Sequence, residues 1–385
     1  MNRIAALRFH TLHIPFRQRF RHASAERNAT SSLWIEAIGE DGQVGVGESC
    51  PRPYVTGETL DTARTFFADY HAEVIAEIRD AASLRAWVAA NTRRIDRHPA
   101  AWCAIELALI DLFARQTGQT AEAWLGLPEA AGRFQYSAVL GDSDPNTFAA
   151  TFARYRDIGM TDFKLKLSGD LGRDREKLAV LKSEGVAVER LRLDANNLWQ
   201  DATAARTYLI ALDAPAFAIE EPLKTGQRME LPMLAQALNV AIILDESLCR
   251  IDELPDYAPG TRWIPNLRVS KLGGLLRTLA LVDAATERGM PLIIGAQVGE
   301  TSLLTRVSLT VARAADKALL AQEGAFGTLL LESDVCKPTL MFGHGGTLQF
   351  ESSGTGWGLA CAPATDWLQA GVDPCLHPSR TNDVE

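Results

Sequence analysis

Residues 161–170 read TDFKLKLSGD, and they place two lysines, Lys164 and Lys166, inside a short run of apolar residues. Side chains two positions apart on a strand point to the same face. If the run is a strand, two ammonium groups therefore share one face of an element that otherwise looks buried. A solvated edge strand would have polar neighbours, whereas the neighbours here are phenylalanine and leucine. The stretch predicts a buried strand that carries a like-charged pair.

Runs of the same kind recur along the chain from about residue 131. They are FQYSAVLG, DFKLKL, RLRLDAN, FAIEEP, AIILDES, NLRVSK, PLIIGAQ and a weaker GTLLLE, with helical segments between them. The polar residues that end six of the runs follow one another at intervals of 25 to 28 positions: Lys166, Asp194, Glu220, Asp245, Lys271 and Gln297. Such an interval fits a strand, a helix and two loops, and eight strands of this kind predict a (β/α) barrel. A doubly wound open sheet is the alternative, but no Gly-rich phosphate loop follows the early strands.

The first 130 residues have a different pattern. RIAALRFHTLHIPF and SSLWIEAIGEDGQVGVGESC read as strands, and helical stretches begin near Thr59 and Pro99. The second of these stretches is apolar nearly all round, which predicts a buried helix. The end of the chain, from GHGGTLQF on, is Gly-rich and is expected to pack back on the first domain. We therefore expect an α+β domain at 1–130, a barrel at 131–345 and a C-terminal segment at 346–385.

The composition limits the classes of function. The chain has 385 residues, is 47% hydrophobic and carries a formal net charge of −9, which argues against nucleic acid as a partner. No apolar run approaches the roughly 18 residues of a membrane span, and no signal-peptide pattern opens the chain. Six cysteines without a CxxC spacing are typical of reduced thiols. These features predict a soluble, cytoplasmic globular protein.

Three acidic residues end successive predicted strands: Asp194, Glu220 and Asp245. In a (β/α) barrel the carboxyl ends of the strands meet at one mouth, where active sites lie. Each acid alone is explained as well by a loop carboxylate or a helix N-cap. Three carboxylates at one mouth repel one another unless a hard cation sits between them, and oxygen ligands suit Mg²⁺. The three acids therefore predict a magnesium site.

The lysine pair is expected at the same mouth. Each ammonium raises the cost of charging the other, so the pKa of at least one of them is expected to fall. A lysine with a lowered pKa can act as a general base, and its charged neighbour favours a carboxylate substrate. No histidine occurs between His98 and His344, so imidazole does not serve the predicted barrel. A lysine base beside Mg²⁺ suggests removal of a proton next to a carboxylate.

With these motifs the sequence resembles the enolase superfamily, and within it the muconate lactonizing (mandelate racemase/muconate cycloisomerase-like) subgroup. The likeness covers nearly the whole chain: KLK, LDANN, IEEP and LDES match the subgroup's strand ends, and AIELALIDLFARQTGQTAEAWLG matches one of its helices. It implies a (β/α)7β-type TIM barrel with an N-terminal α+β capping domain, which the C-terminal segment completes. It also implies Mg²⁺, with Mn²⁺ as an alternative, and a homo-oligomer. The implied metal ligands are Asp194, Glu220 (rather than Glu221) and Asp245, with Lys166 as base and Lys164 as its electrostatic partner.

Two departures from the subgroup bear on the reaction. Many relatives carry a second acid/base lysine on the sixth strand, five residues before a Gly-Gly pair, and Arg268 stands there. Arginine stays protonated, so Arg268 would act as a fixed cation if it faces the mouth, which we favour. Lys271 would serve as a second base only if a bulge turns it inward. The stretch QEGAFGTLLLE also lacks the Asp-x-Asp that holds the substrate's amino group in dipeptide epimerases.

Loops of the first domain are expected to cover the mouth and to set specificity. FRQRFRHASAERN and PRPYVTGE carry the candidates Arg17, Arg19, Arg21, His22, Arg52, Tyr54 and Glu58. Solvated surface explains each of them as well as a basic lid that recognises a second anion. The residues predicted to bind substrate are Arg21, Tyr54, Ser137, Asn196, Gln297 and Glu300.

The leading hypothesis is an Mg²⁺-dependent enzyme that acts on a small carboxylate with Lys166 as its single base, as a cycloisomerase or a lyase. The alternative within the superfamily is a racemase or epimerase of N-acyl amino acids or dipeptides that uses Lys166 and Lys271. A Schiff-base aldolase and a non-catalytic binding protein are further alternatives.

Overall fold

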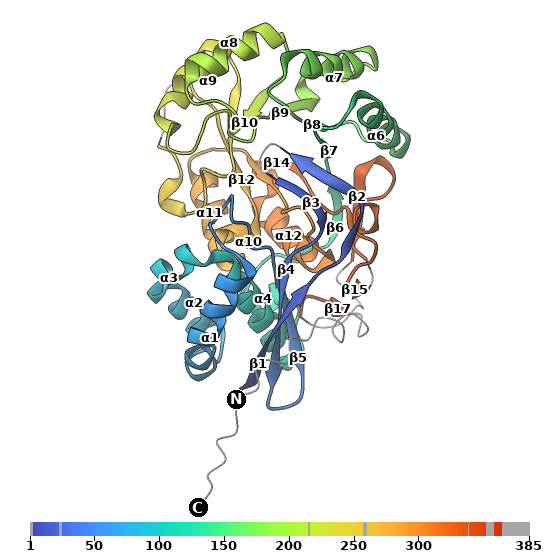
Figure 1. Ribbon diagram of the computed structural model, residues 1–385. Coiled ribbons are helices and arrows are strands. Elements are labelled where there is room, and N and C mark those ends of the chain that lie inside the picture. Colours follow the sequence, from blue (N-terminus) through green and yellow to red (C-terminus); the bar gives the residue numbers. More distant parts are fainter. Residues whose placement is uncertain are drawn as a thin grey trace, which may run out of the picture.

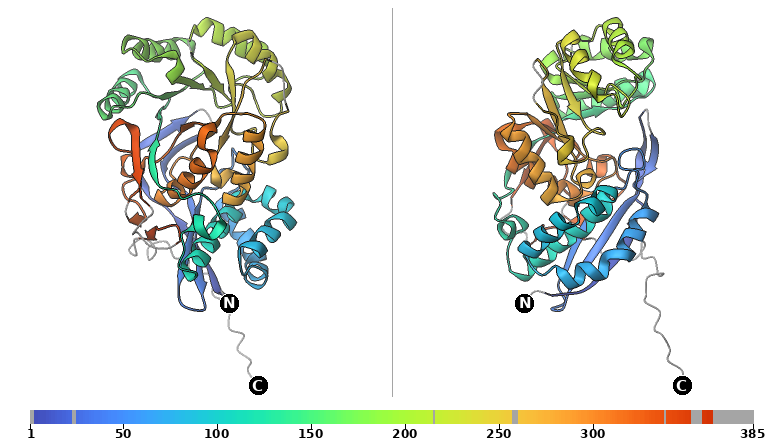
Figure 2. Two further views of the ribbon diagram at one scale, coloured as in Figure 1. Left: turned by 180° about the vertical axis from the view of Figure 1, so that it is seen from behind. Right: turned by 90° about the vertical axis from the view of Figure 1, so that its left-hand side faces the viewer.

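The computed structural model in Figure 1 describes residues 3–22, 25–214, 216–256, 260–337, 339–351 and 358–363. For residues 18–22, 25, 26, 362 and 363 the description covers the backbone only. The barrel helices within residues 171–238 and the cap helices within residues 60–97 lie at opposite ends of the molecule (Figure 2).

Eight parallel strands form one curled sheet, in which each strand pairs with the next along the chain. They are β7 (Ala138–Leu140), β8 (Phe163–Lys166), β9 (Leu191–Asp194), β10 (Ala218–Glu220), β11 (Ala241–Leu244), β12 (Trp263–Leu267), β13 (Leu292–Ile294) and β14 (Leu319–Gln322). A backbone hydrogen bond of 2.8 Å from Ser137 N to Gln322 O joins the two outer strands. The strand order never reverses, as it would in a doubly wound sheet. The predicted barrel architecture is confirmed.

Helices follow the strands and surround the sheet (Figure 1). They are α6 (Pro145–Ile158), α7 (Leu171–Ser183), α8 (Ala202–Leu212), α9 (Leu231–Leu238), α10 (Val269–Leu272), α11 (Leu275–Glu287) and α12 (Ser302–Ala315). Three of them begin at an aspartate, Asp144, Asp170 or Asp201, whose side chain accepts a hydrogen bond from a backbone N–H of the first turn. Short 3₁₀ turns lie at Val188–Arg190, Arg228–Glu230, Ile251–Glu253, Asp316–Ala318, Gly327–Leu329 and His344–Gly346.

Two of the predicted strands are placed wrongly. The sixth strand ends at Leu267, and Lys271 lies in the helical turn α10, which ends at Gly273 with φ +81°. Glycine favours this left-handed conformation because it has no Cβ. The eighth strand is LLAQ, whereas the predicted run GTLLLE begins as a 3₁₀ turn. That run is apolar because its leucines line a cavity rather than the sheet.

The N-terminal part is an antiparallel sheet with helices packed on it. The sheet consists of β1 (Ile4–Leu12), β4 (Ser32–Gly39) and β5 (Val44–Ser49), and β2 (Pro15–His22) forms a hairpin with β3 (Ala25–Ala29). The helices are α1 (Leu60–Glu77), α2 (Ala81–Ala90), α3 (Thr92–Arg97), α4 (Pro99–Gln116) and α5 (Ala121–Leu125). Helix α4 is buried from Pro99 to Ala114, as predicted. It lies so close to β5 that a Cβ on Gly47 would come within 2.0 Å of Ala104 O.

The C-terminal segment returns to the N-terminal part. Strand β16 (Thr347–Phe350) pairs with β6 (Gly132–Gln135), and β15 (Cys336–Lys337) pairs with β17 (Ala362–Pro363). Leu359 N donates to Asp111 Oδ1 of α4 at 2.7 Å. Cys336 and Cys361 form a disulfide, so the expectation of reduced thiols is wrong for this pair. The spacing gave no signal, because 25 residues separate the two cysteines.

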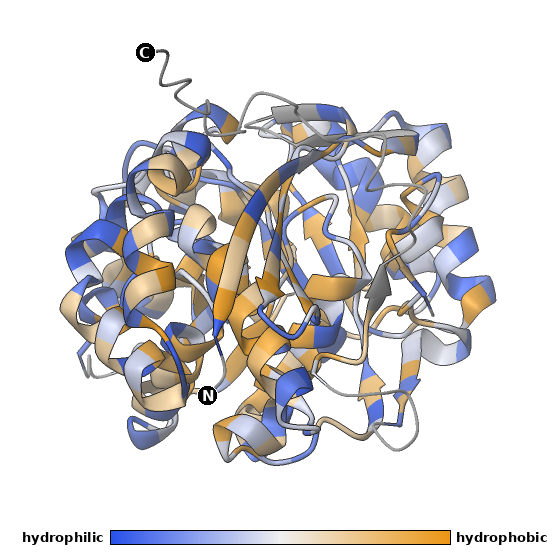
Figure 3. Ribbon diagram, turned by 90° about the horizontal axis from the view of Figure 1, so that it is seen from below, coloured by the Kyte–Doolittle hydropathy of each residue, from blue (hydrophilic) through white to orange (hydrophobic). Residues whose placement is uncertain are grey.

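Apolar residues, orange in Figure 3, concentrate in the interior of the molecule. One continuous cluster of buried apolar residues runs from the cap sheet through α4 into the barrel helices. A second cluster fills the inside of the sheet: Ala218, Ala241, Ile243, Ile264, Ile293 and Ala321. Among the described residues, no helix is long and apolar enough to span a membrane.

Candidate active site

Charged side chains from several strand ends meet in one buried cluster at the mouth of the barrel. Every carboxylate predicted as a metal ligand is fully buried, and so is the second acid of the IEEP motif. The cluster consists of Lys164, Lys166, Asp194, Glu220, Glu221, Asp245, Arg268, Lys271 and Glu323. The predicted convergence of the strand ends is therefore present in the fold.

Lys164 is surrounded by carboxylates. Its Nζ lies 3.1 Å from Glu220 Oε2, 2.5 Å from Glu323 Oε2 and 3.6 Å from Asp194 Oδ2. Burial alone would lower the pKa of Lys164, but the carboxylates outweigh burial and raise it above its ordinary value. The expectation of a lowered pKa is wrong for Lys164, because its neighbours are mainly acids rather than Lys166. The surrounding carboxylates therefore favour the charged form of Lys164.

Lys166 lies at the surface of the cavity. Its Nζ donates to Asp194 Oδ2 at 2.8 Å and to Asn196 Oδ1 at 2.7 Å. Behind it, Lys177 Nζ donates to the Lys166 carbonyl oxygen at 2.8 Å, which fixes the end of β8. Lys166 and Asn196 both line the cavity. The amine can therefore meet a bound molecule while its position is held from two sides.

The pKa values of the three predicted metal ligands are shifted in different directions. Burial raises the pKa of Asp194 and of Asp245, but nearby cations outweigh burial and bring both pKa values below the usual range. The cations are Lys166 and Lys164 for Asp194, and Arg268 and Lys271 for Asp245. Burial raises the pKa of Glu220 to about 8, because Lys164 offsets only part of the cost.

The donor set suits a hard divalent cation, since it consists of buried carboxylate oxygens on neighbouring strand ends. In this arrangement, however, those oxygens form ion pairs with lysine and arginine side chains. The described residues contain no group of three acidic, histidine or cysteine side chains placed to hold a metal ion. Glu221, the neighbouring acid, turns away: its Oε1 accepts from Asp245 N at 2.6 Å and from Ser247 N at 2.9 Å.

Arg268 and Lys271 occupy different places. Arg268 lines the cavity, where its guanidinium contacts Asp245 and donates from Nη1 to Gln297 Oε1 at 3.2 Å. Lys271 Nζ donates to Asp245 O at 2.6 Å, to Asp245 Oδ1 at 3.0 Å and to Asn266 O at 2.9 Å. It is not one of the described residues that line the cavity. The ammonium therefore holds two strand ends together, and Arg268 is the side chain that faces the mouth.

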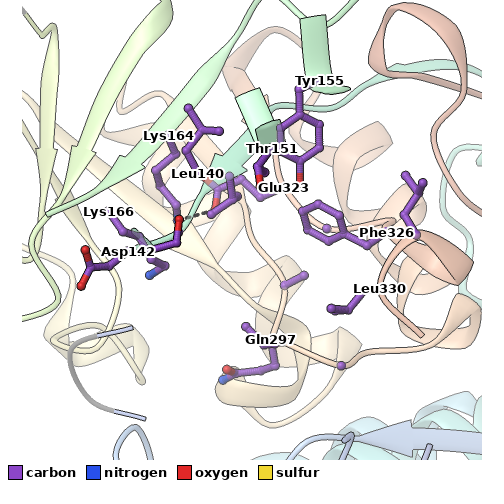
Figure 4. Close-up of a pocket in the computed structure, with 18 of the residues that line it drawn as sticks. Leu140, Asp142, Thr151, Tyr155, Lys164, Lys166, Gln297, Glu323, Phe326 and Leu330 are labelled. Atoms are coloured by element: carbon purple, nitrogen blue, oxygen red, sulfur yellow. Dashed lines mark hydrogen bonds and ion pairs between the residues drawn. The ribbon is translucent and has the colours of Figure 1, made fainter. Parts of the chain in front are cut away.

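The cavity above the cluster has a volume of about 1120 Å³. In Figure 4, Lys164 and Lys166 lie on one side of the cavity, and Thr151 and Tyr155 of α6 lie toward Phe326 and Leu330 on the other. Of the residues predicted to bind substrate, four line this cavity: Tyr54, Asn196, Gln297 and Glu300. It is large enough for a drug-sized ligand.

Two further residues were predicted to bind substrate. One of them is not among the residues that line the cavity, and the side chain of the other is not described. Ser137 is buried beneath the mouth and donates to Asp162 Oδ1 at 2.9 Å, so it is not a cavity residue. The side chain of Arg21 lies outside the described residues. Arg17 of the expected lid donates to the carbonyl oxygens of Leu331 and Glu332 rather than into the cavity.

The sequence interpretation missed Glu323, which lines the cavity and pairs with Lys164 and Arg192. The signal was present, because Glu323 follows Gln297 by 26 positions, the interval already seen along the barrel. The eighth strand was instead predicted at the apolar run GTLLLE, which is not a strand. Asp142, Thr151, Tyr155 and Phe326 are further cavity residues that no motif indicated.

Residues 147–364 match the family described as Enolase C-terminal domain-like, which covers more than half of the chain. The chain belongs to this family. A hydrophobic dipeptide epimerase of Enterococcus faecalis is 27% identical over 75% of this chain and 81% of its own length. A chloromuconate cycloisomerase of Cupriavidus pinatubonensis is 25% identical over 84% and 87%. A dipeptide epimerase of Cytophaga hutchinsonii, solved with Mg and the dipeptide D-Ala-L-Val, superposes with a TM-score of 0.83 at 20% identity and covers 95% of this chain and 97% of that one.

These likenesses confirm the enolase superfamily and its muconate lactonizing subgroup, and they make the protein an enzyme of the isomerase or lyase kind. The enolase-superfamily relatives support proton abstraction as the common chemistry. Two epimerases are 27% identical to the chain and the cycloisomerase is 25% identical, so the comparisons favour the racemase or epimerase alternative over the cycloisomerase hypothesis.

Proposed function

We propose that this enzyme removes the proton next to the carboxylate of a substrate derived from an amino acid, such as a dipeptide or an N-acyl amino acid, with Lys166 as the base. The observation that carries the proposal is the Lys166 amine at the cavity surface, held by Asp194 and Asn196. The similarity to dipeptide epimerases supports the substrate class.

Mg²⁺, or Mn²⁺ in its place, would be held by Asp194, Glu220 and Asp245. When bound, it supplies a Lewis acid that favours negative charge on the substrate carboxylate. The oxygen-only donor set supports this assignment, as does the Mg in the solved relative. Arg268 and Lys271 lower the pKa of Asp245, which favours the ionised form that a metal ligand needs.

The side chains of the chain itself have distinct roles in the proposal. Lys166 takes the proton from the carbon beside the carboxylate. Lys164 stays protonated, because Glu220, Glu323 and Asp194 hold its pKa above the ordinary value, so it supplies fixed positive charge. Arg268 adds a second permanent cation at the cavity surface. Both cations favour the negative charge that develops as the proton leaves.

The stereochemical course separates two candidate reactions. Epimerisation, which the relatives support, needs a proton donor on the face opposite Lys166. Lys271 is a poor candidate for this role, because three oxygen atoms hold its ammonium outside the cavity. A reaction on one face, either cycloisomerisation or β-elimination, is the second candidate, and the presence of Arg268 at the mouth favours it.

Proton NMR in D₂O with Mg²⁺ tests the proposal. Pools of dipeptides, N-succinyl amino acids, muconates and sugar acids are offered to the protein, with an EDTA control. Deuterium beside the carboxylate with inversion supports epimerisation, and deuterium without inversion or a changed double bond supports the one-face reaction. Borohydride trapping of substrate on a lysine would instead indicate Schiff-base chemistry. Failure of every pool to exchange would count against the proposal and favour a binding protein.

A further inference from the structure

Arg52 is buried, and no carboxylate oxygen of the described residues lies within 4.0 Å of its guanidinium. Eight lysine and arginine side chains are buried in the described part of the chain: Arg52, Lys164, Lys166, Lys177, Arg192, Arg268, Lys271 and Arg306. Seven of them have a carboxylate oxygen within 4.0 Å, and Arg52 is the exception. Burying a charge is costly unless nearby groups compensate it. Glu300 is close enough for the charge of Arg52 to lower its pKa, but the direct partners of the guanidinium are neutral, which points to a specific role.

The partners of Arg52 are backbone carbonyls from three places in the chain. Nη1 donates to Ser31 O at 2.9 Å and to Pro51 O at 2.8 Å, and Nη2 donates to Val298 O at 2.7 Å. Ser31 precedes β4 and Pro51 follows β5, so both belong to the cap, whereas Val298 follows β13 of the barrel. The planar guanidinium, with its fixed fork of donors, can span acceptors on separate segments.

Both loops that Arg52 joins line the catalytic cavity. Tyr54 stands on the cap loop that starts at Pro51, and residues 296–300 form the barrel loop that contains Val298. Gln297 on this loop accepts from Arg268 Nη1 at 3.2 Å, and its own N–H donates to Glu300 Oε1 at 2.6 Å. A shift of Val298 therefore reaches Arg268 through one neighbouring residue.

The barrel loop has little room to adjust by itself. Gly299 has φ +93°, and a Cβ there would lie 3.0 Å from Phe16 Cζ and 3.1 Å from Thr30. Phe16 and Thr30 belong to the cap, so the loop is packed directly against it. The position of the loop thus depends on how the cap sits on the barrel. Arg52 links the two at Val298, and Glu48 of the cap accepts hydrogen bonds from Thr301 at the end of the same loop.

We propose that Arg52 is a positioning residue: it fixes the cap loop 51–58 to the barrel loop 296–301 and thereby sets the position of Gln297 and of the Arg268 guanidinium. The structural part of this inference stands by itself. Its catalytic consequence rests on the proposed function, because it concerns the stabilisation of negative charge at the substrate.

Amide hydrogen exchange measured by mass spectrometry tests the structural part without any substrate. The variants are Arg52→Lys, which keeps the charge and loses the planar fork, and Arg52→Met, which loses both. Arg306→Lys is the matched control, because Arg306 is another buried arginine but pairs with Glu122, away from the cavity. We expect faster exchange in both 51–58 and 296–301 for the Arg52 variants only. Unchanged exchange in 296–301 would overturn the inference.

Steady-state kinetics on a substrate found by the NMR screen test the catalytic part. We expect Arg52→Lys to lower kcat by about tenfold or more with a smaller change in KM, since misplacement of a catalytic group acts on the chemical step. Guanidinium ion added to Arg52→Ala should restore part of kcat, which relief of global instability would not do. An unchanged kcat in Arg52→Lys overturns this part. If the wild type incorporates deuterium into no substrate, the proposed function is refuted instead. The amide hydrogen exchange of the protein still decides the structural role of Arg52.

Discussion

The barrel mouth and the seam between cap and barrel both bury carboxylates, but they stabilise them by different means. At the mouth, Asp194 and Asp245 lie 2.8 Å and 3.0 Å from lysine ammonium groups. At the seam, Glu48 accepts from Thr301 N at 2.9 Å and from Thr301 Oγ1 at 2.5 Å. Glu106 of α4 accepts from Leu276 N of α11 at 3.0 Å. Among the described residues, neither glutamate has a lysine or arginine nitrogen within 4.0 Å.

The difference appears in the charge states. Cations bring the pKa of Asp194 and of Asp245 below the usual range, so both stay ionised at neutral pH. Burial raises the pKa of Glu48 to about 8 and that of Glu106 to about 7, because hydrogen bonds from neutral donors offset only part of the cost of burying charge. Asp194 and Asp245 at the mouth therefore keep their charges over a wide range of pH, whereas Glu48 and Glu106 at the seam change charge near neutrality, as does Glu220 at the mouth.

The largest expected effect belongs to the mouth. Replacement of the base in Lys166→Met should lower the rate of deuterium incorporation by about 10³-fold, within the range that general-base catalysis contributes. Lys182→Met is the matched control, because Lys182 is exposed on α7, and it should leave the rate unchanged. A Lys166→Met variant that retains the wild-type rate would move the proton transfer to another residue.

The contribution of the seam to the free energy of unfolding should depend on pH. Because the pKa of Glu48 is about 8 in the folded protein and 4.5 as its ordinary value, the folded state binds this proton more tightly. Its contribution to stability is complete below pH 4.5 and is lost as the pH rises to about 8. At 1.36 kcal/mol per unit, the loss is on the order of 5 kcal/mol. Thermal unfolding between pH 5 and 9 should be less pH-dependent in Glu48→Gln than in the wild type.

An exposed acid provides the control for the seam. Asp252→Asn, on a side chain that is 73% exposed, should keep the wild-type pH dependence. Equal slopes in Glu48→Gln and the wild type would show that Glu48 does not titrate in this range, and the contrast between seam and mouth would then be smaller than the structure indicates.

The disulfide adds a third kind of link at the edge of the cap. Reduction of Cys336–Cys361 should lower the free energy of unfolding by about 3 kcal/mol, as expected for closure of a loop of this length. Unfolding in denaturant with and without dithiothreitol measures the change. The Cys336→Ser/Cys361→Ser double variant should be insensitive to the reductant. A wild type that is equally insensitive would indicate that the two thiols are not linked in solution.

The smallest expected effect is stabilisation by metal. Mg²⁺ at 100 times its Kd should raise the free energy of unfolding by about 2.7 kcal/mol, by mass action on the folded state. Calorimetry with Mg²⁺ and with EDTA measures the shift in Tm. Asp194→Asn should abolish the shift, and the exposed Asp252→Asn should retain it. A shift that survives in Asp194→Asn would place the metal elsewhere.

The sequence was sufficient for the barrel and for most of the mouth, because a buried strand followed by a polar residue leaves a regular mark every 25 to 28 positions. This pattern is misleading where an apolar run is not a strand. The leucines at 329–331 line the cavity, and because the eighth strand was predicted there, the true strand just before Glu323 was overlooked. It fails at Lys271 as well, because α10 starts one residue after Arg268 and changes which side chains face inward.

Other features have no local signal at all. Arg52 and Val298 are 246 positions apart, and their contact depends on how the cap docks. The raised pKa of Lys164 likewise depends on Glu220 and Glu323, which come from distant strands. Ser137 was predicted to bind substrate, but its hydroxyl donates to Asp162, which is 25 positions away in the chain, and Ser137 is not among the described residues that line the cavity.

The pairing of β6 with β16 has a consequence for biosynthesis. The two strands bracket the barrel, and Gln135 pairs with Thr347, so the ribosome makes more than 200 residues between them. At the usual 5 to 20 residues per second, β6 waits roughly 10 to 40 s for its partner. During this interval its edge, and the cap surface that receives Leu359, stay open to chaperones or to a neighbouring nascent chain. Completion of the fold is therefore a late event. The interval between synthesis of β6 and synthesis of β16 is the period in which this edge is exposed to aggregation.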